Sequence, residues 1–190
     1  MKTFKTLAVI AAACLGSAAA WGAGGLPVGT VITAQVNGAS TTLLGLDHLF
    51  EDEAGSNVTA LAAADLEFLT GDANVGIDFF TDGRVQIWNN SGAASLGGNY
   101  SFTFSFAGLG QPLASFVPLD LSEVNGGNVS LLLVDDHTVS LTLTNLNFSD
   151  AYGSFTTQLN VTAVPEPASL VLMGAGLGLL ALRRTKRVAA

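Results

Sequence analysis

The chain has 190 residues, 49% of them hydrophobic and 12% charged, with 15 acids against 7 Lys and Arg. This length is that of one ordinary domain with short additions, and the net charge of −8 argues against binding to nucleic acid, whose phosphates an acidic surface repels. The single cysteine excludes a framework of disulfides within the chain.

The first 20 residues have the three parts of a secretory signal peptide. These are a positive start, an apolar core and a small-residue cleavage site, at Lys2 and Lys5, residues 7–15, and residues 18–20. Cys14 lies inside the apolar core, and lipidation there would leave a core of only about seven residues, at the bottom of the usual range. We therefore predict a signal peptide at residues 1–20 and a processed chain that starts at Trp21 and has no cysteine.

The body, residues 21–163, is predicted to be a single domain of 143 residues. Arg84 is its only cation and stands against 14 acids, so that its net charge is −13. A field of this sign repels nucleic acid and acidic polymers at close range and attracts cations. The same excess of charge also keeps a secreted protein soluble without any ligand.

Apolar residues alternate with hydroxyl residues along three segments of the body. Residues 100–106 place four aromatic rings on one side, residues 139–143 place three aliphatic side chains on one side, and residues 154–161 repeat the pattern. Alternation at period two is typical of strands with one buried and one exposed face. The body is therefore predicted to be all-β.

Three short polar segments are predicted to be turns. Thr81-Asp82-Gly83-Arg84 lies between two apolar runs, and its Asp-Gly pair predicts a hairpin whose two central residues both have positive φ. Residues 125–128 are predicted as a turn before a strand at 129–134, and residues 135–137 as the turn after that strand.

These signals together predict strands near residues 30–36, 43–50, 65–70, 75–80, 85–89, 99–107, 113–120, 129–134, 138–144 and 152–163. Short strands in this number favour a two-sheet β-sandwich of jelly-roll or immunoglobulin-like type. One segment is ambiguous, because Asn57 before an alanine-rich stretch is also typical of a helix start. For residues 57–69 we expect a short helix or turn that leads into a strand at Asp65.

The body offers few groups for catalysis, and we expect no enzymatic activity. It has no cysteine and no lysine to act as a nucleophile, and no serine in a G-x-S-x-G turn. Its two histidines, His48 and His137, are expected in exposed loops. A carboxylate pair for glycoside hydrolysis stays open, because the spacing of the 14 acids selects no pair.

The one candidate metal site is a calcium loop that begins at Asp72. Asp72, Asn74 and Asp78 place oxygen side chains as the first half of such a loop does, while Gly83 stands where the loop needs its glutamate. The alternative is a strand from Val75 with solvated acids. We expect no cofactor, with calcium at these three residues as the alternative.

The end of the chain combines three dissimilar features. The stiff triplet Pro165-Glu166-Pro167 precedes an apolar run at residues 168–182, and a basic cluster follows, formed by Arg183, Arg184, Lys186 and Arg187. The apolar run predicts one short transmembrane helix of 15 residues, which would span roughly 22 Å of a hydrocarbon core about 30 Å thick. The basic end is expected to stay in the cytoplasm, with the body outside.

This order of features resembles the PEP-CTERM sorting signal of Gram-negative bacteria that make extracellular polysaccharide. The resemblance covers residues 164–190, with Pro165, Glu166 and Pro167 as the triplet and Arg183 and Arg184 in the basic end. It implies an intermediate held in the inner membrane, recognition by an exosortase-like membrane protease, and release or transfer to the cell surface or extracellular matrix. A plain tail anchor is the alternative, and it leaves the triplet unexplained.

The resemblance supplies a polysaccharide context for the body. We predict a non-enzymatic structural or adhesive component of an extracellular polysaccharide matrix, such as a biofilm or floc. The alternative is a carbohydrate-binding or carbohydrate-active sandwich domain, which needs Trp or Tyr side chains on its outside. The body has four such residues, Trp21, Trp88, Tyr100 and Tyr152, and Tyr100 is predicted to point inward.

Overall fold

The computed structural model describes residues 25–39, 42–63 and 65–162, which fold into strands joined by short turns. The strands are β1 (Val31–Val36), β2 (Leu43–Gly45), β3 (Val58–Ala60), β4 (Phe68–Thr70), β5 (Val75–Phe79), β6 (Arg84–Asn89), β7 (Asn99–Ala107), β8 (Leu113–Asp120), β9 (Val124–Asp135), β10 (Thr138–Phe148) and β11 (Ser154–Val161). The single 3-10 turn η1 (Leu46–His48) is the one helical element in this part of the chain. The all-β prediction is therefore confirmed.

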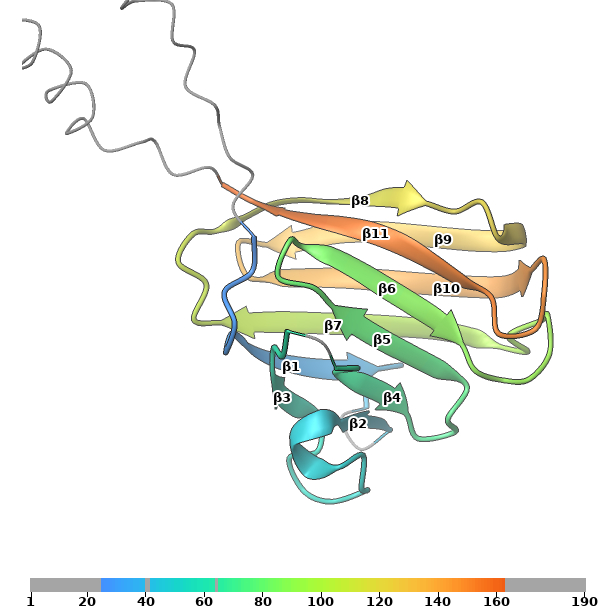
Figure 1. Cartoon of the computed structure of the whole chain (residues 1–190), viewed down its shortest axis with the longest axis horizontal. Helices are drawn as coiled ribbons and strands as arrows, with labels where there is room; N and C mark the ends of the chain where they lie inside the picture. Colours follow the sequence, from blue (N-terminus) through green and yellow to red (C-terminus); the bar gives the residue numbers. More distant parts are fainter. Residues whose placement is uncertain (1–24, 40–41, 64, 163–190) are drawn as a thin grey trace, which may run out of the picture. The chain divides into compact units, whose positions relative to one another are not determined.

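The strands form two antiparallel sheets that pack face to face (Figure 1). The five-stranded sheet has the order β3-β1-β7-β10-β9, and the six-stranded sheet has the order β2-β4-β5-β6-β11-β8. β8 and β9 are the edge strands on one side of the sandwich, and β2 and β3 are the edge strands on the other. The predicted two-sheet arrangement is thereby confirmed.

The alternating side chains point into one core between the sheets. Phe104 on β7 has 1% of its surface exposed, and its ring centroid lies 5.1 Å from that of Phe79 on β5 and 6.0 Å from that of Phe68 on β4. The three predicted inward residues of β10, Val139, Leu141 and Leu143, have no exposed surface. Full burial of such a side chain contributes roughly 1.5–3 kcal/mol. The assignment of inward and outward faces from the sequence is correct for both strands.

The helix or turn expected after Asn57 is wrong. Residues 58–60 form β3, in which Thr59 pairs with Ile32 of β1. Asn57 caps no helix, and its side-chain amide donates a hydrogen bond of 2.9 Å to the carbonyl of Ala34. The helix preference of alanine over other residues is at most roughly 0.7 kcal/mol per residue, which pairing with a buried strand outweighs.

Two predicted strands are shorter in the structure, one because it ends early and one because it begins late. The strand expected at 43–50 ends at Gly45, and the chain then passes through η1 to Leu49 and Phe50, whose φ angles of 54° and 58° leave the extended region. The strand expected from Asp65 begins at Phe68.

The Asp-Gly hairpin between β5 and β6 is confirmed, but with a different turn. Only Gly83 has a positive φ, of 85°. Its N–H donates to the carbonyl of Phe80, and the N–H of Phe80 donates to the carbonyl of Arg84, both at 2.9 Å. This is a three-residue loop with the glycine in the bulge position. Asp82 instead accepts hydrogen bonds from the backbone N–H and the Nε of Arg84.

The turn predicted at residues 125–128 is wrong, because β9 runs through it. The register with β10 shifts between Thr144 and Asn147, which marks a β-bulge. Gly127 has a φ of 86°, and a Cβ there would lie 2.3 Å from the carbonyl oxygen of Asn145. Glycine therefore serves here to bend a paired strand and not to end it, while the predicted turn at residues 135–137 is present.

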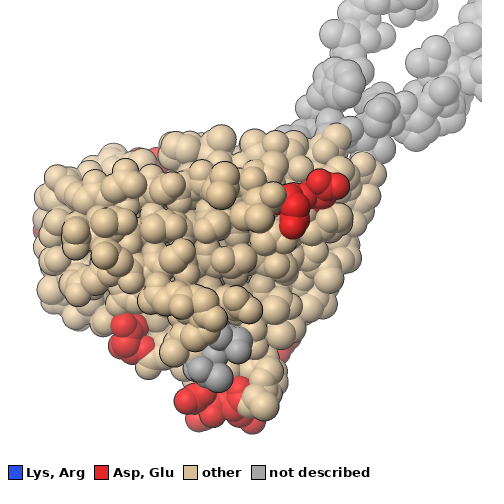
Figure 2. Space-filling model, turned by 180° about the vertical axis from the view of Figure 1, so that it is seen from behind, with Lys and Arg blue, Asp and Glu red and all other residues tan. Residues whose placement is uncertain are grey.

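On the outer face of the five-stranded sheet, the outward positions of β7, of β10 and of β9 up to Val134 carry no charge (Figure 2). Those positions on β7, β10 and β9 are Ser101, Thr103, Ser105, Thr138, Ser140, Thr142, Thr144, Asn128, Ser130, Leu132 and Val134. Asp135, the exposed last residue of β9, lies opposite Thr138 and is the exception. The acids seen in Figure 2 lie at the border of this face. The negative charge of the body is therefore unevenly distributed.

The two ends of the described body are anchored at one end of the sandwich. Leu26 donates to the carbonyl of Thr81, and Leu159 of β11 donates to the carbonyl of Gly83 in the same turn. The predicted signal peptide at residues 1–20 and the predicted transmembrane helix at residues 168–182 lie outside the described residues. Within the part of the chain that the structure describes, no helix is long and apolar enough to cross a membrane.

Candidate functional site

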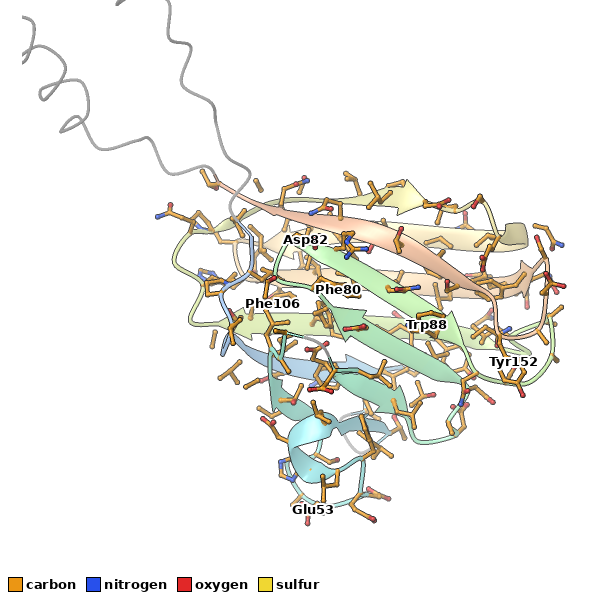
Figure 3. All side chains as sticks on the ribbon, viewed as in Figure 1. Glu53, Phe80, Asp82, Trp88, Phe106 and Tyr152 are labelled. Atoms are coloured by element: carbon orange, nitrogen blue, oxygen red, sulfur yellow. The ribbon has the colours of Figure 1, made fainter. Side chains whose placement is uncertain are left out.

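Two of the four Trp and Tyr residues of the body lie exposed on the six-stranded sheet (Figure 3). Trp88 is on β6, where it pairs with Gly76 of β5 and Ser154 of β11, and 40% of its surface is exposed. Tyr152 stands in the turn before β11 and is 63% exposed. Tyr100 is buried, as predicted, and Trp21 lies outside the described residues.

The rings of Trp88 and Tyr152 line one shallow pocket of about 430 Å³, and the other lining residues are Leu66, Leu69, Gly76, Asn89 and Asn90. This volume is within the range of roughly 300–1,000 Å³ that is usual for small-molecule sites. A Cβ on Gly76 would lie 3.3 Å from Leu66 Cδ1 and 3.6 Å from Trp88 Cβ. Glycine at this position therefore keeps the space between the leucines and the indole open.

Tyr152 is held in an unusual backbone conformation at the rim of this pocket. Its φ of 64° is rare for a bulky residue, and such conformations cost about 1–3 kcal/mol. The N–H of Asn89 donates 2.9 Å to the carbonyl of Gly153, which ties the turn to β6. The Tyr152 hydroxyl lies next to Gly92, where an added Cβ would be 3.4 Å from it. The turn therefore fixes an exposed ring beside the loop that follows β6.

Two asparagines contribute polar groups, and they have different roles. Asn89 is 1% exposed, donates to the carbonyl of Ala93 at 2.7 Å and accepts from the N–H of Ser91 at 3.1 Å, so it holds the loop after β6. Asn90 is exposed and donates to the carbonyl of Ala73 at 2.8 Å. Its side-chain oxygen accepts no hydrogen bond from the described residues and is free to accept one from a ligand hydroxyl.

A pair of carboxyl groups, those of Glu67 and Asp78, lies near the pocket on the six-stranded sheet. Asp78 follows Gly76 by two residues on β5, and Glu67 beside it has no exposed surface. The Glu67 carboxyl accepts hydrogen bonds from the N–H of Ala62 at 3.0 Å and of Phe79 at 2.6 Å. Burial, with the neighbouring Asp78, raises the pKa of Glu67 to about 8. Glu67 is therefore protonated at neutral pH and holds the loop before β4 against β5.

The structure brings two of the three predicted calcium residues, Asp72 and Asn74, into contact, and Asp78 interacts with other groups. Asp72 accepts hydrogen bonds from the Thr70 hydroxyl at 2.6 Å, the Tyr100 hydroxyl at 2.8 Å and the side chain of Asn74 at 3.0 Å. Burial opposes ionisation of Asp72, but these hydrogen bonds outweigh it and lower its pKa. Asp78 interacts with Glu67 instead. Among the described residues no three His, Cys, Asp or Glu side chains gather as a metal site, and calcium binding stays a prediction.

The histidines occupy separate loops. His48 of η1 is partly exposed, and its Nδ1 lies 2.6 Å from Glu53 Oε1. His137 is exposed in the turn between β9 and β10, where its N–H donates to Asp135 at 2.8 Å. Neither histidine lines the pocket of Trp88 and Tyr152.

The predicted sorting residues, Pro165, Glu166, Pro167, Arg183 and Arg184, lie outside the described residues, and for them the sequence comparison decides. Residues 163–187 match the family described as the PEP-CTERM protein-sorting motif. This chain carries a PEP-CTERM motif at its C-terminal end. The predicted resemblance is thereby confirmed, and the motif implies export, processing by an exosortase, which is a membrane protein, and sorting to the cell surface. No curated protein and no solved structure matches the chain.

The two rings of the pocket can be predicted from the sequence by residue type, but the residues between them cannot. Gly76 was the available signal, because a glycine inside an apolar strand often marks a close approach. Leu66, Leu69 and Asn90 come to the pocket from loops and a short strand whose course the sequence did not show. Their contribution could be found only from the structure.

Proposed function

We propose that this protein is a non-enzymatic component of the cell surface or extracellular matrix of a Gram-negative bacterium, delivered by PEP-CTERM sorting, and that it binds neutral polysaccharide there. The observation that carries this proposal is the pocket shared by two exposed aromatic rings, Trp88 and Tyr152. The chain would thus combine the structural and the carbohydrate-binding alternatives, as an adhesive component of a matrix.

The chemistry of the pocket suits a sugar ring. A pyranose has an apolar face of C–H groups and an edge of hydroxyls, and aromatic side chains offer a flat apolar surface with a polar tip. Trp88 and Tyr152 supply two such surfaces, and the Asn90 side-chain oxygen and the Tyr152 hydroxyl supply polar groups at the rim. A few convergent polar groups in a mainly apolar pocket are typical of ligand sites.

The charge of the body favours a neutral polymer over an acidic one. Arg84 is the only cation against 14 acids, and it is engaged with Asp82 at 2.9 Å and with the ring of Phe80 at 4.4 Å. Uronic-acid or phosphate groups would therefore meet repulsion without a compensating cation. A neutral glucan carries no charge and is therefore not repelled by the acidic body.

The absence of a reaction is supported by the carboxyl groups near the pocket. Glycosidases use two carboxyl groups that both face the scissile bond. Glu67 has no exposed surface, and its two carboxyl oxygens accept hydrogen bonds from the backbone N–H groups of Ala62 and Phe79. A carboxyl held in this way stabilises the loop and does not reach a substrate.

Affinity electrophoresis in gels that contain a neutral glucan, such as hydroxyethyl cellulose, tests this proposal. We expect the wild-type chain to be retarded, and Trp88→Ala to reduce the retardation at least about tenfold in apparent affinity, as the loss of about 1.4 kcal/mol would do. Tyr152→Ala should act in the same direction.

Phe80→Ala is the matched control, because Phe80 is a half-buried ring just after β5 that does not line the pocket. It should leave retardation unchanged. A second gel with alginate, an acidic polymer, should show none. Wild-type protein that migrates equally in both gels, or retardation that survives Trp88→Ala together with Tyr152→Ala, would reject sugar binding at this pocket.

A further inference from the structure

β9 is an edge strand with a long uncharged stretch. It pairs with β10 on one side only, and its last part pairs in regular register, from Asn128 opposite Thr144 to Leu133 opposite Val139. Between Glu123 and Asp135 the strand contains no charged residue and no proline. Every second N–H and C=O of such an edge points away from the sheet, ready to pair with another strand.

The inward side of β9 is incompletely covered. Leu141 and Leu143 of the neighbouring β10 have no exposed surface, whereas Val129, Leu131 and Leu133 on the same face of β9 are only partly buried against the core. On the outward side of β9, Leu132 is 58% exposed and Val134 is 52% exposed. Both faces of this strand thus leave apolar surface in contact with water.

The other edges of the described sandwich have the features that prevent pairing. β2 and β3 contain three residues each. The loop between them carries the exposed acids Glu51, Asp52 and Glu53, the last of which is labelled in Figure 3. β8 carries Pro118, which has no N–H to donate. Short strands, charges and proline are the usual protections of an edge, and the regular part of β9 has none of them.

We infer that β9 binds β9 of a second copy of this chain in antiparallel register, which joins two five-stranded sheets into one. Charge selects this occupant and this orientation. Two bodies of charge −13 repel one another, so contact is favoured where neither carries charge. Open chains of copies would require the β2 and β3 edge of one copy to pair with β9 of the next. That pairing is disfavoured, because the acids beside β2 and β3 would lie close to a second acidic body.

A two-fold axis near Leu131 satisfies both the charges and the side chains. It places Leu131 opposite Leu131 and Val129 opposite Leu133 on the inward side, so the partly buried residues cover one another. It also places Asp135 opposite Gly127, whereas a parallel pairing would place Asp135 opposite Asp135, which is repulsive. An interface of this kind uses the same patch on both copies and closes as a dimer.

The dimer would carry two copies of the pocket between Trp88 and Tyr152. Two linked sites raise apparent affinity for a polymer with repeated units, because the second binding event is intramolecular. This consequence rests on the proposed function, whereas dimerisation itself does not.

Light scattering after size-exclusion chromatography tests the inference on the full chain in a mild detergent. At about 100 μM, where an interface of micromolar Kd is occupied, we expect the mass of two chains for wild type. Leu132→Lys combined with Val134→Lys should give the mass of one chain, because both exposed apolar side chains are lost from the interface and the two lysines at position 132 become diagonal neighbours across the axis. Thr33→Lys combined with Gln35→Lys, at exposed positions of β1 on the same face, should stay dimeric.

Hydrogen exchange of the β9 peptide supplies a second measurement that needs no variant. The N–H groups of β9 that point away from β10 should exchange slowly at high protein concentration and fast when the protein is diluted. A wild-type chain of single mass, or a dimer that persists in the β9 double variant, overturns the inference. Protection of β9 that appears only when hydroxyethyl cellulose is added also overturns it, and would mean that the edge binds polymer.

Discussion

Glu67 is the one acid of the described chain that has no exposed surface, and its protonation couples stability to pH. Its folded pKa of about 8 lies above the ordinary value of 4.5, mainly because of burial. The folded chain therefore keeps a proton that the unfolded chain has lost, and stability falls as pH rises through the window between these values, by up to about 1.4 kcal/mol per pH unit. The raised pKa of Asp78 acts in the same direction.

Replacing Glu67 by glutamine should remove most of this pH dependence. At pH 5 the variant should be less stable by about 1–3 kcal/mol, because an amide cannot accept from both the Ala62 and the Phe79 N–H groups. Towards pH 8 the difference from wild type should shrink or reverse. Urea unfolding at both pH values measures it, and parallel pH profiles for wild type and Glu67→Gln would show that Glu67 ionises normally.

At the residue scale, the sequence named the exposed rings but could not place them together. Trp88 and Tyr152 were identified by type alone, as residues that a sugar site would need. Their convergence depends on the pairing of β6 with β11 and on the positive φ of Tyr152. Neither is encoded in a local pattern, because pairing between distant strands is decided by the whole core and a tyrosine rarely adopts that φ.

β7 is the element whose two faces the sequence predicted best, and it allows a direct test of the core. Phe104→Ala should lower the free energy of unfolding by about 3–5 kcal/mol, as the truncation of a buried aromatic residue does. Phe104 is 1% exposed and packs against Phe79, Phe68 and Phe102. Thr103→Glu, on the outward face, is the control and should cost well under half as much. Equal losses in urea unfolding would contradict the face assignment.

Elements whose form depends on a neighbour were the ones that the sequence did not predict. Alternation at period two was sufficient for β7, for residues 139–143 of β10 and for β11, because their inward residues alternate regularly along the strand. It failed at Gly127, where glycine makes a bulge inside β9, and at residues 58–60, where pairing with β1 overrides the helix preference of the alanines. In both cases the local residues suit two conformations, and the partner strand selects one.

At the scale of the whole molecule, the PEP-CTERM motif follows the sandwich without a spacer. The N–H of Thr162 donates 2.8 Å to the carbonyl of Pro112, and the matched motif begins at residue 163. The four residues from there to Glu166 can extend at most about 14 Å. A processing enzyme that grips the triplet must therefore approach to within that distance of the last fixed strand of the body.

Glu166 carries the one charge of the Pro-Glu-Pro triplet, so Glu166→Ala tests the role of the motif while leaving the apolar run and the basic end intact. We expect the variant to accumulate with its full tail in the inner membrane, whereas wild type reaches the surface without residues 183–187. Asp150→Ala, at an exposed acid of the body, is the control and should be processed normally. Mass spectrometry of both fractions measures the outcome. Wild-type surface protein that keeps Arg183 and Arg184 would establish a permanent tail anchor, because an exosortase that cuts at the triplet removes everything beyond it.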